Sequence, residues 1–197
     1  MAIVNHERKE VSCKVVYFGA PGCGRTQNLR SIYRNSANQT DSQNVIELAS
    51  PATGNHYFEF LPVSLGQVGG YHVKLHIFTE PLEIYPSVRD VVLQGVDGCV
   101  FIVDSQFSQL EENVRCLKKA QEHLQTLGYK LESLPTIIQY NKRDLDDAVE
   151  CSVLSRELNK LQVPEIEAVA LEDKGTLETV HKMAQMILDE MSQGDSE

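Results

Sequence analysis

Short hydrophobic runs and longer amphipathic stripes follow one another along this chain. Runs of apolar and β-branched residues predict buried strands, and they occupy residues 11–18, 99–103, 136–140 and 166–170. Apolar positions that recur every three or four residues predict amphipathic helices. Helices are expected at residues 25–35, 87–95, 110–127, 153–161 and 177–191. Strands and helices therefore alternate, which predicts an α/β fold with a mostly parallel central sheet and helices on both faces.

A hairpin is predicted after the first helix. Residues 71–79 alternate between apolar and polar side chains, as a half-exposed strand does, and residues 56–64 are its expected partner. Three glycines between these strands predict the turn, namely Gly66, Gly69 and Gly70. The preceding residues 36–56 are polar and rich in turn formers, with a short strand expected at 45–49. No repeat or internal boundary is visible, so we expect a single domain over residues 1–197, with a polar tail at 192–197.

The composition excludes several classes of protein. The chain has 197 residues, with 18 Lys and Arg against 28 Asp and Glu, a net charge of −10. So acidic a chain lacks the basic surface that binds nucleic acids or anionic lipids. The sequence shows no signal peptide, membrane span or lipidation motif, so we expect a cytoplasmic protein with no direct membrane anchor. Its five cysteines are widely spaced, without a C-x-x-C pair, and are expected to be free thiols.

A glycine-rich stretch, GAPGCGRT at residues 19–26, follows the first predicted strand. Its spacing is that of a phosphate-binding loop, G-x-x-x-x-G-K-[ST], with Arg25 in place of the lysine. Backbone N–H groups of such a loop converge on phosphate oxygens at the positive end of a helix. The Thr26 hydroxyl is the candidate Mg²⁺ ligand. The other candidate contacts to nucleotide are Gly19, Gly22, Cys23, Gly24, Arg25 and Gln27. A glycine-rich turn that binds nothing explains the stretch as well, whereas a dinucleotide-binding fingerprint fits it less well.

A second motif, Asn141-Lys142-Arg143-Asp144, directly follows the predicted strand at 136–140. It has the form N-K-x-D and stands at the strand end where open α/β sheets bind their ligands. The Asp144 carboxylate can accept hydrogen bonds from the ring N1–H and the amine of guanine, whereas adenine would leave it unpaired. Asn141 can reach the base and the glycine-rich loop, and the stem of Lys142 can cover the base. The alternative is a polar turn closing a strand. The stretch Asp104-Ser105-Gln106, which ends another predicted strand, is expected to cap the next helix.

With these motifs in place, the chain resembles the bacterial MglA group of Ras-like small GTPases, which controls cell polarity and surface motility. The resemblance is carried by residues 13–17, 28–29, 32–33, 58–62, 95–98, 103–106, 139–145 and 169–170. It implies a three-layer P-loop small GTPase fold that binds GTP or GDP with Mg²⁺. It also implies that backbone N–H groups at Val169 and Ala170 meet the guanine carbonyl. Partners implied are a Roadblock-type, MglB-like protein and polarity or motility effectors, which bind switch loops near residues 37–56 and 79–90 and recruit the protein to a cell pole.

Four departures from that family fall on positions that act in hydrolysis. Arg25 keeps the charge of the phosphate-loop lysine but is a longer, planar fork. Gly54 stands where the family has an arginine finger, and no arginine occurs between Asn35 and Val88. Leu82 and Glu83 replace the glycine and glutamine that sense the γ-phosphate and orient water. We therefore expect a guanine-nucleotide-binding regulator with weak or absent GTP hydrolysis. The alternative is a nucleotide-independent interaction scaffold, a pseudo-GTPase.

Overall fold

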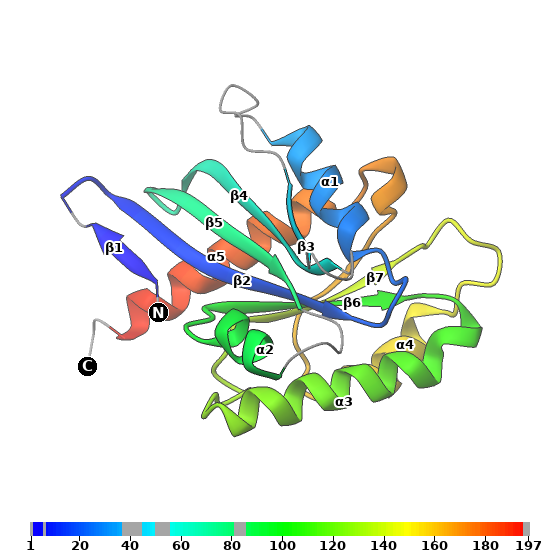
Figure 1. Ribbon diagram of the computed structural model, residues 1–197. Coiled ribbons are helices and arrows are strands. Elements are labelled where there is room, and N and C mark those ends of the chain that lie inside the picture. The colour runs from blue at the N-terminus through cyan, green and yellow to red at the C-terminus, as the bar shows by residue number, and fades with distance from the viewer. Residues whose placement is uncertain (1, 6, 37–44, 50–55, 81–85, 195–197) are drawn as a thin grey trace.

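The structure is a computed structural model that describes residues 2–5, 7–36, 45–49, 56–80 and 86–194. Figure 1 labels its main elements. The strands are β1 (Ile3–Asn5), β2 (Glu10–Gly19), β3 (Ile46–Ala49), β4 (His56–Val68), β5 (Tyr71–Thr79), β6 (Gly98–Asp104), β7 (Thr136–Asn141) and β8 (Glu165–Glu167). The helices are α1 (Arg25–Asn35), α2 (Pro86–Leu93), α3 (Leu110–Thr126), α4 (Cys151–Leu158) and α5 (Thr176–Gly194). Two 3-10 turns, η1 (Phe107–Gln109) and η2 (Ala170–Glu172), complete them.

All eight strands belong to one mixed sheet. Its order is β3-β4-β5-β2-β6-β7-β8, and β1 pairs antiparallel with the first half of β2. The five strands from β5 to β8 in this order are parallel, while β3 and β4 run antiparallel to their neighbours. Because parallel strands end at the same edge, the C-terminal ends of β2, β5, β6 and β7 lie together. That edge carries both sequence motifs.

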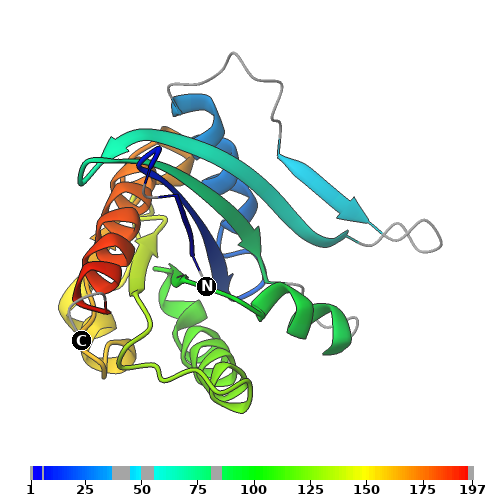
Figure 2. The ribbon, with the colours of Figure 1, turned by 90° about the vertical axis from the view of Figure 1, so that its left-hand side faces the viewer.

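Helices cover both faces of the sheet, as Figures 1 and 2 show together. On one face, α1 and α5 bury Leu29, Ile32, Met183 and Ile187 against β2, β4 and β5. On the other face, the apolar sides of α2, α3 and α4 pack on β6, β7 and the end of β2. The predicted α/β fold with a mostly parallel sheet is confirmed. In Figure 2, β3 and the adjoining part of β4 extend away from these helices.

Three local predictions differ from the structure. β4 continues to Val68, so only Gly69 and Gly70 form the hairpin turn. Gly66 instead lies inside β4 at φ +71°, where the register with β5 shifts. The register shift marks a β-bulge, and glycine is the residue that most readily takes a left-handed backbone at such a position. The last predicted strand, 166–170, is shorter: β8 ends at Glu167, and Ala170 begins the turn η2.

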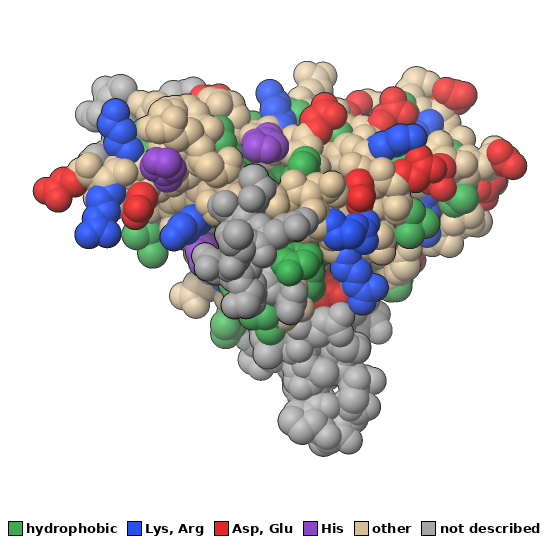
Figure 3. Space-filling model, turned by 90° about the horizontal axis from the view of Figure 1, so that it is seen from above, with side chains coloured by type: hydrophobic (Ala, Val, Ile, Leu, Met, Phe, Trp, Pro, Cys, Tyr) green, Lys and Arg blue, Asp and Glu red, His purple; other side chains and the backbone are tan. Residues whose placement is uncertain are grey.

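Charged side chains of both signs are interspersed on the face seen in Figure 3, with small hydrophobic patches between them. The described residues of that face therefore present no single sign of charge to a ligand. None of the helices in the described part of the chain has the length and hydrophobicity needed to cross a membrane.

Candidate functional site

The glycine-rich loop joins the end of β2 to the start of α1. The Cys23 N–H donates to the Ala20 carbonyl at 3.1 Å and closes the turn. Gly19 has a φ of +143°, and a Cβ there would lie 2.3 Å from the Ile102 carbonyl oxygen. Gly24, at φ +103°, is the N-cap of α1 and provides no side-chain cap. Without a side-chain cap, N–H groups in the first turn of α1 can bind an outside acceptor, which is the arrangement that binds anions.

Arg25 points from the first position of α1 toward the end of β5. Its side chain is largely buried, with 9% of the residue exposed. The Nη1 group donates to the backbone carbonyl of Glu80 at 3.0 Å. Where the motif would place a lysine at the outer phosphates, this guanidinium is therefore bonded to the protein itself.

Cys23 and Thr26 differ in what they can do chemically. Burial raises the pKa of the Cys23 thiol to about 11, with Arg25 partly opposing the shift, so the thiol stays neutral near pH 7. Thr26 is half-buried, and its hydroxyl is the candidate Mg²⁺ ligand. Among the described residues, no cluster of three or more His, Cys, Asp or Glu side chains could hold a metal. Mg²⁺ beside a nucleotide is commonly held by one or two protein oxygens together with phosphate oxygens and water, so the Thr26 hydroxyl could be one of its ligands.

A pocket of about 350 Å³ lies beside the loop, between the end of β7 and η2. We call it the Asn141 pocket; its lining residues are Gly24, Gln27, Asn141, Lys142, Asp144, Leu145, Ala170 and Leu171. The structure thus brings the N-K-x-D motif, the start of α1 and Ala170 together around one space. Gln27 also contacts this segment, since its Nε2 lies 3.5 Å from the Ala170 carbonyl oxygen.

Asn141 joins the loop to the pocket. Its Nδ2 donates to the Cys23 carbonyl at 2.8 Å, and its Oδ1 accepts from the Ala170 N–H at 3.1 Å. A Cβ at Gly24 would lie 2.3 Å from this Nδ2, so only glycine lets the loop approach so closely. The Val169 N–H donates to the Lys174 carbonyl. Both amides expected at a guanine carbonyl therefore already have acceptors within the protein.

Lys142 is held by an aspartate that the sequence did not place in the site. Its Nζ lies 2.6 Å from Asp104 Oδ2, and the Asp104 side chain is 5% exposed. Asp104 Oδ1 accepts from the Gln106 N–H, and the turn η1 that follows shows no side-chain cap. The expected helix cap at residues 104–106 is therefore wrong, because neither η1 nor α3 has a side-chain cap. The Asp104 carboxylate instead neutralises a lysine 38 residues away. Asp144, by contrast, is exposed.

Two apolar residues of the pocket were missed at the sequence level, Leu145 and Leu171. Leu171 is 73% exposed although it is a large hydrophobic residue. The sequence could have indicated Leu171, because it directly follows Val169 and Ala170, which were expected at the guanine carbonyl. Apolar side chains beside an exposed carboxylate suit a flat ligand with a polar edge, such as a nucleobase.

Other predicted site residues lie outside the described residues. They are Gly54, Leu82 and Glu83, with most of the two expected switch loops around them. Thr79, at the start of the second expected switch, is described and buried. Its hydroxyl accepts the Glu59 N–H at 2.8 Å, so it takes part in pairing β4 with β5.

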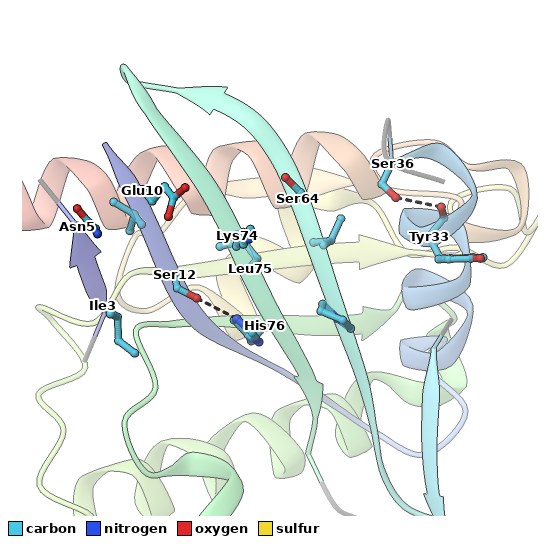
Figure 4. A pocket seen from close by; sticks show the side chains of 13 residues that line it. Ile3, Asn5, Glu10, Ser12, Tyr33, Ser36, Ser64, Lys74, Leu75 and His76 are labelled. Carbon is cyan, nitrogen blue, oxygen red and sulfur yellow. Dashed lines mark hydrogen bonds between the residues drawn. The ribbon is translucent and has the colours of Figure 1, made fainter. Parts of the chain in front are cut away.

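A larger cavity, of about 600 Å³, lies elsewhere on the sheet (Figure 4). It is lined from β1, β2, β4, β5 and the end of α1, and it contains none of the predicted site residues. A hydrogen bond of 2.9 Å joins Ser12 and His76 in it. Lys74 and Glu10 contribute opposite charges. Its chemistry therefore selects no class of ligand, and the Asn141 pocket remains the candidate site.

Comparison with known proteins gives one strong similarity. The chain is 37% identical over 195 residues to the mutual gliding-motility protein MglA of Myxococcus xanthus. The aligned region covers 98% of this chain and 100% of that protein, so it includes both motifs. No family model matches the chain.

Proposed function

This chain belongs to the MglA family of Ras-like small GTPases, and we propose that it binds guanine nucleotide in the Asn141 pocket and along the loop at 19–26. The observation that carries the proposal is the pair of hydrogen bonds through which Asn141 connects Cys23 with Ala170. These bonds hold the glycine-rich loop and the Asn141 pocket at a fixed separation, which supports the proposal. A nucleotide needs both.

The biological role proposed for the protein follows its relative, whose name refers to gliding motility. We propose that it acts in the cytoplasm as a one-domain regulator of cell polarity or motility and is recruited to a cell pole by partners. The partners would be effectors and a Roadblock-type, MglB-like protein that bind the switch loops. Mg²⁺ would be held through Thr26.

Base recognition can be tested with Asp144→Asn. Guanine should bind about 10–100-fold more weakly, because the amide cannot accept both hydrogen bonds of the guanine edge. Xanthine nucleotide should bind more tightly, since its carbonyl replaces the amine and can accept from the new amide. Equilibrium titration with fluorescent GDP and XDP measures both changes.

Asp146→Asn is the matched control for this titration, because Asp146 is also exposed and lies outside the pocket lining. It removes the same charge two residues away and should leave both affinities unchanged. An Asp144→Asn protein with wild-type affinity for GDP would contradict the assignment of the base site.

We further propose that the protein hydrolyses GTP poorly and acts by recruiting effectors. The sequence lacks an arginine finger, a glycine sensor and a water-orienting glutamine, where it has Gly54, Leu82 and Glu83. An arginine finger alone contributes about 10³–10⁵ to the rate. The contact of Arg25 with Glu80 supports the proposal, since it draws charge away from the outer phosphates.

Single-turnover GTP hydrolysis, with and without a Roadblock-type partner, tests this second proposal. The natural chain should stay near the background rate in both conditions. The variant Gly54→Arg/Leu82→Gly/Glu83→Gln restores the family residues and should become faster. Stimulation of the natural chain by the partner to the rate of an activated small GTPase would overturn the proposal.

A pseudo-GTPase scaffold is the second candidate. It is favoured by the same Arg25 contact, because a guanidinium bonded to Glu80 needs no phosphate as its partner. The two candidates differ in whether nucleotide is bound at all, so nucleotide content separates them.

A further inference from the structure

Arg25 lies where two neighbouring strands end. β2 and β5 are parallel and in register, with Tyr17 paired to Thr79. The glycine-rich loop follows β2, and Glu80 follows β5 directly. The Glu80 N–H donates to the Tyr17 carbonyl at 3.0 Å, and the Glu80 carbonyl accepts from Arg25 at 3.0 Å. The backbone of Glu80 is thus held on one side by β2 and on the other by the loop.

Arginine and lysine differ in how they can make this contact. The guanidinium of arginine has five N–H donors in a rigid planar fork. The ammonium of lysine is a compact charge at the end of a flexible four-carbon chain. One donor on Nη1 is used by the Glu80 carbonyl. Among the described residues the guanidinium makes no second hydrogen bond, so its other donors could meet an anion at the loop. A phosphate at the loop and the end of β5 would therefore compete for the same side chain.

The side chain of Glu80 extends the contact into α2. Its carboxylate pairs with Arg89, and the Glu80 side chain is only 11% exposed. Burial raises the pKa of Glu80, while the charges of Arg89 and Arg25 oppose that rise. The next residue of α2, Asp90, contacts His123 of α3 at 2.8 Å. Two successive residues of α2 are thus paired in different directions. Arg89 pairs with Glu80, which follows β5, and Asp90 pairs with His123 of α3.

We propose that Arg25 is a positioning residue that links the phosphate loop to the start of the second switch through the Glu80 carbonyl, and that the Glu80–Arg89 ion pair carries this link into α2. The link itself needs no ligand. Its consequence for nucleotide rests on the proposed function: phosphates that attract the guanidinium weaken its bond to Glu80. A ligand shifts a conformational equilibrium only through such a differential interaction.

The link is tested first in nucleotide-free protein. Hydrogen–deuterium exchange of a peptide covering residues 78–94 should be about threefold or more faster in Arg25→Lys than in the natural chain, because Glu80 loses a partner. Arg30→Lys is the control, since Arg30 is an exposed arginine on the same helix. Its exchange should match that of the natural chain. Equal exchange in all three proteins would overturn the proposal.

A double-mutant cycle on urea unfolding tests whether Arg89 belongs to the same unit. Arg25→Lys and Arg89→Gln, combined, should change the unfolding equilibrium constant by a factor at least about threefold different from the product of the single effects. If the effect of the double substitution equals the product of the single effects, Arg89 is not coupled to Arg25, and that part of the proposal is overturned.

GDP is then added to the exchange experiment. Binding should change exchange over residues 78–94 in the natural chain and change it less in Arg25→Lys. Equal responses in the two proteins would overturn the coupling to nucleotide. If GDP does not bind, the proposed function fails, whereas the nucleotide-free comparison still decides whether Arg25 forms the link.

Discussion

Asp104 and Lys142 form a charged pair at the wall of the Asn141 pocket, 2.6 Å apart. The Lys142 side chain remains 29% exposed, so its charge is only partly withdrawn from water. Lys142 also has a left-handed backbone, at φ +63°. Together the ion pair and the backbone fix the direction in which the lysine stem leaves the loop. In the proposed function, that stem covers one face of the base.

Replacing Asp104 by Asn should make bound nucleotide dissociate about three to ten times faster. The amide still accepts the Gln106 N–H, but it holds the ammonium of Lys142 less firmly, and a hydrogen bond to a charged group is worth about 1.5–3 kcal/mol. Stopped-flow dissociation of fluorescent GDP measures the rate. Asp147→Asn is the control, because Asp147 is an exposed carboxylate that contacts Gln106 and lies outside the pocket lining. Identical rates for the natural chain and Asp104→Asn would show that the pair does not position Lys142.

Among single residues, the sequence predicted those that belong to a motif. It missed those that reach the site only through the packing of distant segments. Asn141, Lys142 and Asp144 come in one run after a hydrophobic strand, so their spacing alone places them together. Asp104 reaches Lys142 across 38 positions, and only the pairing of β6 with β7 brings them into contact. Leu171 has no motif of its own and enters the pocket because η2 follows β8.

Individual elements depend on glycines whose roles differ. Gly19 and Gly22 both have positive φ, +143° and +78°. A Cβ at Gly19 would lie 2.3 Å from the Ile102 carbonyl oxygen and 2.6 Å from Cys23 Sγ, whereas a Cβ at Gly22 would meet nothing within 4 Å. The end of β2 is thus packed tightly against β6, while the tip of the loop is open.

Gly19→Ala should therefore destabilise the fold more than Gly22→Ala. Both substitutions carry a backbone cost of about 1–3 kcal/mol, because a residue with a side chain rarely adopts such φ values. Gly19→Ala adds a clash with backbone, which we expect to cost about 1–3 kcal/mol more. Urea unfolding of the two variants gives the difference directly. Equal stabilities would mean that the contact between the loop and β6 is looser than the structure shows.

Helices and core strands were predictable because each has an unbroken hydrophobic pattern. The bounds of α1 agree with the predicted range 25–35. Features set by backbone irregularity were not predictable. Gly66 was predicted to belong to a turn, but it lies at the β-bulge of β4. β1 has three residues, too few to show an alternation of apolar and polar side chains. It could not be predicted, because only its pairing with β2 defines it as a strand.

For the whole molecule, one sheet edge gathers nearly everything that the proposed function uses. The ends of β2, β5, β6 and β7 bring the loop, Glu80, Asp104 and Asn141 together. This convergence follows from parallel pairing and was predictable from the alternation of strands and helices. The positions expected to act in hydrolysis, Gly54, Leu82 and Glu83, lie outside the described residues.

The central claim is that this edge binds a guanine nucleotide despite the arginine in its phosphate loop. The most direct measurement is the nucleotide content of protein purified without added nucleotide. The protein is denatured, and the released material is separated by ion-exchange chromatography and measured by absorbance. We predict close to one GDP or GTP per chain, with no adenine nucleotide. Protein free of nucleotide that also fails to bind added GDP or GTP with Mg²⁺ would contradict the claim and identify the chain as a pseudo-GTPase.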